Sequence, residues 1–170
     1  MKVFIEEQKF NQPLVIVGLS IAFIIVTISS YNSWENVSTA NIGEQIGALS
    51  GLIIILLVAM LFVFLKLKTR IDEKGVHYQF YPFHLKFKTI SWETISTCSI
   101  RKYDAISEFG GWGMKFSFFR KKGKSFTTKG NIGLQLELKN GTKILIGTQK
   151  KEEIQRAIDT YKNKIVTNEY

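Results

Sequence analysis

The stretches PLVIVGLSIAFIIVTISS (residues 13–30) and IGALSGLIIILLVAMLFVFL (residues 46–65) decide the fold of this chain. They contain 18 and 20 residues, and neither has a charged side chain. At a rise of 1.5 Å per residue, each helix would span about 27–30 Å, the thickness of the hydrocarbon core of a bilayer. Because core helices of soluble proteins rarely have such long uncharged stretches, we expect residues 1–65 to form a transmembrane helical hairpin.

The positive charge of the chain is concentrated after the second apolar stretch. Residues 66–170 hold 21 Lys and Arg against 10 Asp and Glu, a net charge of +11, whereas the preceding residues have a net charge of −2. The connection between the stretches, residues 31–45, has two Glu and no Lys or Arg, while Lys66, Lys68 and Arg70 follow the second stretch. The positive-inside rule therefore predicts that both termini are cytoplasmic and that the connection lies outside.

Two alternatives concern the apolar stretches. The first stretch could be a cleaved signal peptide, but it is longer than the apolar region of most signal peptides, and two Glu precede it. Small residues also recur at four-residue steps, which permits close helix packing either within the hairpin or between two chains. Matching depths in an antiparallel pair favour contact within the hairpin for these small residues: Gly18, Ala22, Gly47 and Gly51.

Residues 66–170 are expected to form one domain, because about 105 residues are enough for an independent core. Period-two alternation predicts strands over residues 68–72, 76–81, 86–92, 94–101 and 114–119. The clearest hairpin joins residues 133–139 to residues 142–147 through Asn140-Gly141, a pair that favours a type I′ turn. Helical spacing of apolar residues then predicts a C-terminal helix with Ile154, Ala157, Ile158, Tyr161 and Ile165 on one face.

A series of short motifs runs through this domain in a fixed order. It begins with Gly111-Trp112-Gly113 and an aromatic strand, and continues with residues 133–138, Asn140-Gly141 and residues 144–150. This series resembles the bacterial PH-like domain family, whose members often follow a two-helix membrane hairpin. The resemblance implies an α+β membrane protein in which a pleckstrin-homology antiparallel β-barrel of seven strands is capped by a C-terminal helix. It also implies a bacterial cytoplasmic membrane location and no catalytic residue.

The densest cationic cluster lies between two expected strands, in a position typical of a loop. Together with the cations that follow the second apolar stretch, it is a candidate contact surface for anionic lipid headgroups, with about 1 kcal/mol from each basic residue near the membrane surface. The alternative is a solvated turn that keeps the domain soluble. The candidate residues are Arg120, Lys121, Lys122, Lys124, Lys66, Lys68 and Arg70.

Other residues with functional chemistry carry weaker signals. Trp112 between two glycines is a candidate lining residue of a small pocket, or else a cover over the mouth of the barrel. His77 and His84 have no cysteine or carboxylate at ligand spacing, so we expect no metal ion and no cofactor. The single cysteine, Cys98, excludes an internal disulfide. The sequence has no nucleophile elbow, Walker motif, Rossmann glycine set or nucleic-acid motif.

These observations predict a noncatalytic, membrane-anchored interaction module. Neither apolar stretch has an ionisable residue, which argues against a channel or a transporter. The expected partners are the lipid bilayer, anionic headgroups, and an unidentified protein or a second copy of the chain, bound for example along an edge strand. Nucleic acid is not expected as a partner. The alternatives are an accessory subunit of a larger membrane complex and an enzyme of unrecognised chemistry.

Overall fold

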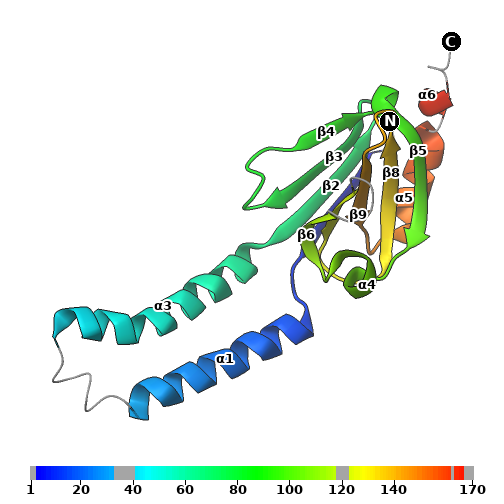
Figure 1. The fold of residues 1–170 in the computed structure, drawn as a ribbon. Helices are drawn as coiled ribbons and strands as arrows, with labels where there is room; N and C mark the ends of the chain where they lie inside the picture. Colours follow the sequence, from blue (N-terminus) through cyan, green and yellow to red (C-terminus); the bar gives the residue numbers. More distant parts are fainter. Residues whose placement is uncertain (1–2, 33–40, 118–122, 162, 167–170) are drawn as a thin grey trace. The chain divides into compact units, whose positions relative to one another are not determined.

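The chain is an α+β protein that forms two compact units (Figure 1). The computed structural model describes residues 3–32, 41–117, 123–161 and 163–166. One unit, Asn11–Phe64, contains two apolar helices. The other unit combines Met1–Phe10 with Leu65–Tyr170 and contains two sheets and the shorter helices.

The helical unit consists of α1 (Pro13–Asn32) and α3 (Ile42–Phe64), which pack against each other. A Cβ atom on Gly51 would lie 3.4 Å from Val26 Cγ1, so this glycine lies at the helix contact, as expected. A Cβ atom on Gly18 or Gly47 would meet no atom within 4 Å, so these two glycines do not take part in that contact. None of the α1 side chains is buried, and apolar side chains are exposed along both helices.

The sequence analysis did not predict the first strand of the second unit. β1 (Phe4–Lys9) pairs antiparallel with β2 (Lys66–Asp72) along its whole length. Its buried side chains are Phe4, Glu6 and Gln8, two of which are polar. Through this pairing, the first ten residues of the chain belong to the same compact unit as Leu65–Tyr170.

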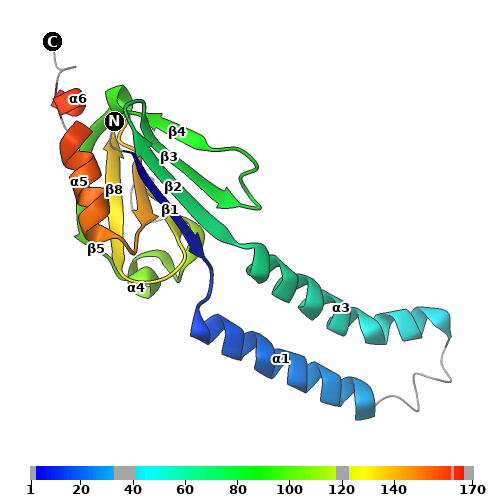
Figure 2. The same cartoon turned by 180° about the vertical axis from the view of Figure 1, so that it is seen from behind.

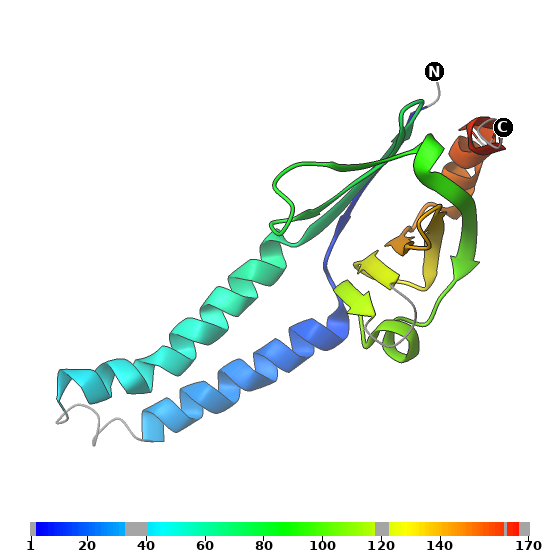
Figure 3. The same cartoon turned by 45° about the horizontal axis from the view of Figure 1, so that its top comes forward.

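The two sheets remain separate layers, and the described residues form no closed barrel (Figure 3). The first sheet has the order β1-β2-β3-β4, with β3 (Gly75–Tyr81) and β4 (Lys88–Ser91). The short 3₁₀ helix η1 (Trp92–Thr94) follows β4 and leads the chain into the second sheet. The α+β class is therefore confirmed, whereas the β-barrel that the family resemblance implies takes the form of two separate sheets in the described part of the chain.

The second sheet has the strand order β5-β8-β9-β7-β6. Its pairs are antiparallel except for β7 and β9, which run parallel, so the expectation of a purely antiparallel arrangement is also wrong. Phe118 and Phe119 of the expected aromatic strand lie outside the described residues. The strands are β5 (Ile95–Lys102), β6 (Gly113–Ser117), β7 (Gly123–Thr127), β8 (Ile132–Leu138) and β9 (Lys143–Gly147).

The predicted hairpin is confirmed, but its turn is one residue longer than expected. β8 and β9 pair antiparallel up to Glu137 and Lys143. The Gly141 N–H donates to the Leu138 carbonyl at 2.8 Å, and the Leu138 N–H donates to the Thr142 carbonyl at 2.9 Å. These bonds enclose a three-residue loop in which Gly141 has a φ of +78°, a conformation that glycine adopts without steric cost.

The predicted C-terminal helix is α5 (Lys151–Tyr161), which packs against β1, β2 and β5 (Figure 2). Its buried side chains are the predicted ones up to Tyr161, and Ile165 lies in the short helix α6 (Asn163–Val166). The Tyr161 ring stacks on Trp92 at 5.7 Å between centroids. The Trp92 indole also donates a 2.9 Å hydrogen bond to the Asp72 carbonyl, so it joins the helix to the first sheet.

A buried polar network holds β1 against the segment that precedes α5. The Glu6 carboxylate accepts hydrogen bonds from the Thr148 hydroxyl at 2.7 Å and from the Gln149 N–H at 2.8 Å. The Gln8 amide donates to the Gly147 carbonyl at 2.8 Å and accepts from the Thr128 hydroxyl at 2.8 Å. A buried carboxylate is costly unless it is hydrogen-bonded, so this network makes the polar face of β1 compatible with burial.

We expect Glu6→Ala to lower the free energy of unfolding by about 1–3 kcal/mol, because it leaves the Thr148 hydroxyl and the Gln149 N–H without their acceptor. Glu7→Ala is the matched control, since Glu7 lies on the outward face and only pairs with Lys66 and Lys68. Its effect should stay within about 1 kcal/mol. Thermal unfolding of the full chain in detergent would measure both, and equal effects would contradict the anchoring role of Glu6.

Candidate functional site

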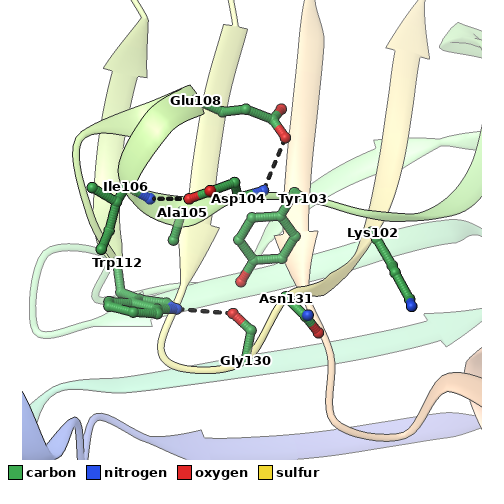
Figure 4. Close-up of a pocket in the computed structure, with 9 residues that line it drawn as sticks. All are labelled: Lys102, Tyr103, Asp104, Ala105, Ile106, Glu108, Trp112, Gly130 and Asn131. Carbon is green, nitrogen blue, oxygen red and sulfur yellow. Dashed lines mark hydrogen bonds between the residues drawn. The ribbon is translucent and has the colours of Figure 1, made fainter.

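A hollow of about 470 Å³ lies beside Trp112, at one end of the five-stranded sheet (Figure 4). The Trp112 side chain is one of those that line this hollow. The hollow is bordered by the ends of β5 and β8, by the helix α4 (Ala105–Phe109) and by the start of β6. The lining residues are Lys102, Tyr103, Asp104, Ala105, Ile106, Glu108, Trp112, Gly130 and Asn131.

The short helix α4, which the sequence analysis did not predict, forms one wall of the hollow. The Asp104 carboxylate caps this helix by accepting hydrogen bonds from the N–H groups of Ile106 at 2.9 Å and Ser107 at 3.1 Å. These bonds, from Ser107 and then Ile106, lower the pKa of Asp104. Gly110 ends the helix in the left-handed conformation, with a φ of +71°.

The second carboxylate of the hollow is held in an ion pair. Both Glu108 oxygens accept from the Arg101 guanidinium, at 2.8 and 3.0 Å, in a bidentate arrangement. Arg101 Nε also donates to the Gln135 side-chain oxygen at 3.1 Å, which fixes the guanidinium on the surface of the sheet. The hydrogen bonds that Asp104 and Glu108 accept from the protein hold α4 at the border of the hollow.

Aromatic side chains form the floor of the hollow. The Trp112 indole N–H donates to the Gly130 carbonyl at 2.9 Å, and the indole packs against the buried cluster that contains Tyr103 (Figure 4). Burial raises the pKa of Tyr103 to about 12, and the negative charge of Glu108 adds to the increase. Ile106 is 62% exposed beside this floor. The hollow thus offers an apolar surface with Lys102 and Asn131 at its border, which suits noncovalent contact with a side chain of a partner.

The cations that follow the second apolar stretch are paired along the outward face of the first sheet. Lys66 and Lys68 both lie 3.2 Å from the Glu7 carboxylate, and Arg70 lies 3.1 Å from the Asp72 carboxylate. The hydrogen bonds from Lys68 and then Lys66 lower the pKa of Glu7. The pairing reduces the net charge that this surface offers to a lipid headgroup.

The predicted cationic cluster is described only in part. Arg120, Lys121 and Lys122 lie outside the described residues. Lys124 lies on β7, in the five-stranded sheet, with its ammonium group 5.8 Å from the centre of the Phe116 ring. The cations of β2 belong to the other, four-stranded sheet.

Sequence reasoning missed a hydrogen-bonded chain that crosses three strands of the first sheet. His77 Nε2 lies 2.9 Å from Asp72 Oδ1, and His77 Nδ1 lies 2.8 Å from Thr89 Oγ1. The order carboxylate, imidazole, hydroxyl is that of acyl-transfer triads. Here Arg70 also pairs with the same carboxylate, and the Lys74 N–H donates to it at 2.9 Å. This series of hydrogen bonds therefore links β2, β3 and β4.

Metal ligation has no candidate within residues 3–32, 41–117, 123–161 and 163–166, where no three His, Cys, Asp or Glu side chains gather.

Sequence comparison does not assign the chain to a known family. No protein-family model matches the chain, and no curated protein matches its sequence.

Asp72→Asn is expected to lower the free energy of unfolding at neutral pH by about 1–3 kcal/mol. Desolvation by burial, the largest single effect, raises the pKa of Asp72, but the hydrogen bonds from His77 and the Lys74 N–H and the nearby positive charges together lower it below 3.8. A lowered folded-state pKa stabilises the fold above the unfolded value, and this contribution is lost as the pH falls through the folded-state pKa.

The stability difference between wild type and Asp72→Asn should therefore be present above pH 3.8 and shrink below it. Denaturant unfolding followed by tryptophan fluorescence at several pH values would measure it. Glu73→Gln, which alters the exposed neighbouring carboxylate, is the control and should have the smaller effect at neutral pH. A difference that persists unchanged into strong acid would show that the charge of Asp72 is not what stabilises this site.

Proposed function

We propose that the chain is a noncatalytic, membrane-anchored PH-like module of the bacterial cytoplasmic membrane. In this proposal α1 and α3 span the bilayer, and the sheet-containing unit lies on the cytoplasmic side. There it binds a protein partner, a second copy of the chain or the lipid surface. The proposal keeps the PH-like assignment as a family resemblance based on motif order, and its β-structure consists of two sheets of four and five strands.

The observation that carries the proposal is the exposure of two helices of membrane-spanning length. Pro13–Asn32 and Gln45–Phe64 are each 20 residues long, with mean hydropathies of 2.4 and 2.9, and none of either stretch is buried. In water, this apolar surface would be unfavourable by about 25 cal/mol for each Å². A hydrocarbon environment removes that cost, and an α-helix satisfies its own backbone hydrogen bonds there.

The proposed orientation follows from charge. The sheet-containing unit carries the cationic excess, and the connection between the helices has no Lys or Arg. Cationic flanks are retained on the cytoplasmic side during insertion. Both helices lead into adjacent strands of one sheet, since β1 precedes α1 and β2 follows α3, which agrees with one membrane side for both ends of the pair.

Two features support interaction rather than catalysis as the role of the module. Within the described part of the chain, the strand orders leave β1, β4, β5 and β6 at sheet edges, where a partner strand could add by β-augmentation. The hollow beside Trp112 offers an apolar floor whose nearby carboxylates are already engaged. An accessory subunit of a larger complex would use the same edges, so purification of the full chain in mild detergent separates the two possibilities through stoichiometric co-purification.

We expect the full chain to stay in the membrane pellet after a carbonate wash. Ile54→Lys, at the middle of α3, should reduce insertion, because a lysine at the centre of a spanning helix costs about 2.5–3.5 kcal/mol. Phe64→Lys is the matched control at the end of the same helix, where a lysine side chain can extend to the interface. Release of the unmodified chain by carbonate, or equal insertion of both variants, would refute the spanning role.

Single cysteines would test the orientation in a Cys98→Ser background. A membrane-impermeant maleimide added to spheroplasts should label Tyr31→Cys, at the end of α1, and leave Glu73→Cys, in the β2–β3 turn, unlabelled until the membrane is opened. The reverse labelling pattern would place the sheet-containing unit outside the cell.

A further inference from the structure

An apolar patch lies on the connection between β3 and β4. Four large side chains within seven residues are well exposed there: Tyr81 at 39%, Phe83 at 54%, Leu85 at 79% and Phe87 at 47%. Single exposed apolar residues are normal on protein surfaces, whereas a cluster such as this marks an interaction site. We define this patch as the β3–β4 tip.

The exposure of the tip comes from an ordered conformation. The His84 N–H donates to the Phe80 carbonyl at 2.8 Å, and the Gln79 amide donates to the carbonyls of His84 and Leu85, each at 3.0 Å. The His84 ring packs against Phe126, with 5.5 Å between ring centres. The His84 side chain turns inward, and these hydrogen bonds hold the backbone on both sides of it. Leu85 is therefore exposed on an ordered loop, so binding need not order the loop backbone.

Strand register places the tip at the end of the sheet where the chain leaves for both apolar helices. Tyr81, the last residue of β3, pairs with Lys66, and Lys66 also pairs with Lys9, the last residue of β1. Only Leu65 separates α3 from β2, and one residue spans about 3.5 Å. The connection from β1 to α1 is three residues long, 10–12. The tip therefore begins within a few residues of both helix junctions.

Cationic side chains accompany the apolar ones. Lys86 and Lys88 alternate with Leu85 and Phe87 along the chain, and Lys88 is exposed. Lys124 lies on β7 two residues before Phe126, whose ring packs against His84 of the tip. Burial lowers the pKa of His84, and the positive charges of Lys88 and Lys124 lower it further. Apolar side chains flanked by lysines are the pattern of segments that lie at the boundary between headgroups and acyl chains.

We propose that Phe83, Leu85 and Phe87 insert into the bilayer that α1 and α3 span. Lys86, Lys88 and Lys124 then contact anionic headgroups around the inserted side chains. This inference rests on the proposed membrane anchoring and adds to it a second attachment point, which holds one face of the sheet-containing unit against the lipid. A bilayer fits better than a protein groove because the register fixes the tip beside the two junctions.

The test uses the full chain, reconstituted into vesicles of equal parts phosphatidylglycerol and phosphatidylcholine. An environment-sensitive fluorophore is attached to Leu85→Cys in the Cys98→Ser background. We expect a blue shift of its emission and quenching by lipids that carry a nitroxide on the upper acyl chain. Glu73→Cys is the matched control, because the β2–β3 turn lies at the opposite end of the same strands, and its probe should show neither change.

The outcomes separate this inference from the proposed function. An unshifted, unquenched probe on Leu85→Cys in a carbonate-resistant protein would overturn the insertion of the tip and leave the membrane anchor intact. A blue shift without quenching by the lipid nitroxide would also overturn it, because the tip would then be covered by protein. Release by carbonate would refute the anchor itself. Phe83→Ser/Phe87→Ser, with the probe again on Leu85→Cys, should reduce both the shift and the quenching, which checks that these two side chains help to hold the loop in the lipid.

Discussion

The sheet-containing unit depends on one interaction: the buried Glu6 carboxylate accepts two hydrogen bonds. Glu6 connects the first strand of the chain to Thr148 and Gln149, more than 140 residues later, at the point where the chain turns into α5. Gln8 makes a parallel connection to Gly147. The carboxylate thus joins the two ends of the unit at the start of its C-terminal helix. The domain is thereby built around the segment that leads into α1.

Periodicity predicted the elements whose buried faces are apolar. The two apolar helices, the β8–β9 hairpin and α5 follow from runs, alternation and helical spacing, because in each case hydrophobic burial selects the residues. β1 could not be predicted in this way, since Glu6 and Gln8 face inward and its apolar Ile5 faces outward. Its burial depends on partners distant in sequence. The parallel pairing of β7 with β9 likewise depends on tertiary arrangement and leaves no local signal.

The candidate site shows the same limit. Trp112 between two glycines was a recognisable signal, and the structure places it on the floor of a hollow. The bidentate pair of Arg101 with Glu108 and the chain from Asp72 through His77 to Thr89 depend on how strands and α4 align, so their spacing in the sequence does not reveal them. Ion pairing also changes the interpretation of the cations. The sequence suggested that Lys66 and Lys68 were available for lipid headgroups, but both pair with Glu7 in the structure.

The ladder between β1 and β2 has a mechanical consequence for the two apolar helices. Because β1 runs into α1 after three residues and β2 follows α3 after one, a displacement of one helix along the other would shear this ladder. Strand faces alternate with a period of two, so a slip of one residue would turn Glu6 and Gln8 to the outside and bring Glu7 into the interior. Such a slip would remove the Glu6 carboxylate from Thr148 and Gln149. The pairing of β1 with β2 therefore resists sliding of the two helices along each other.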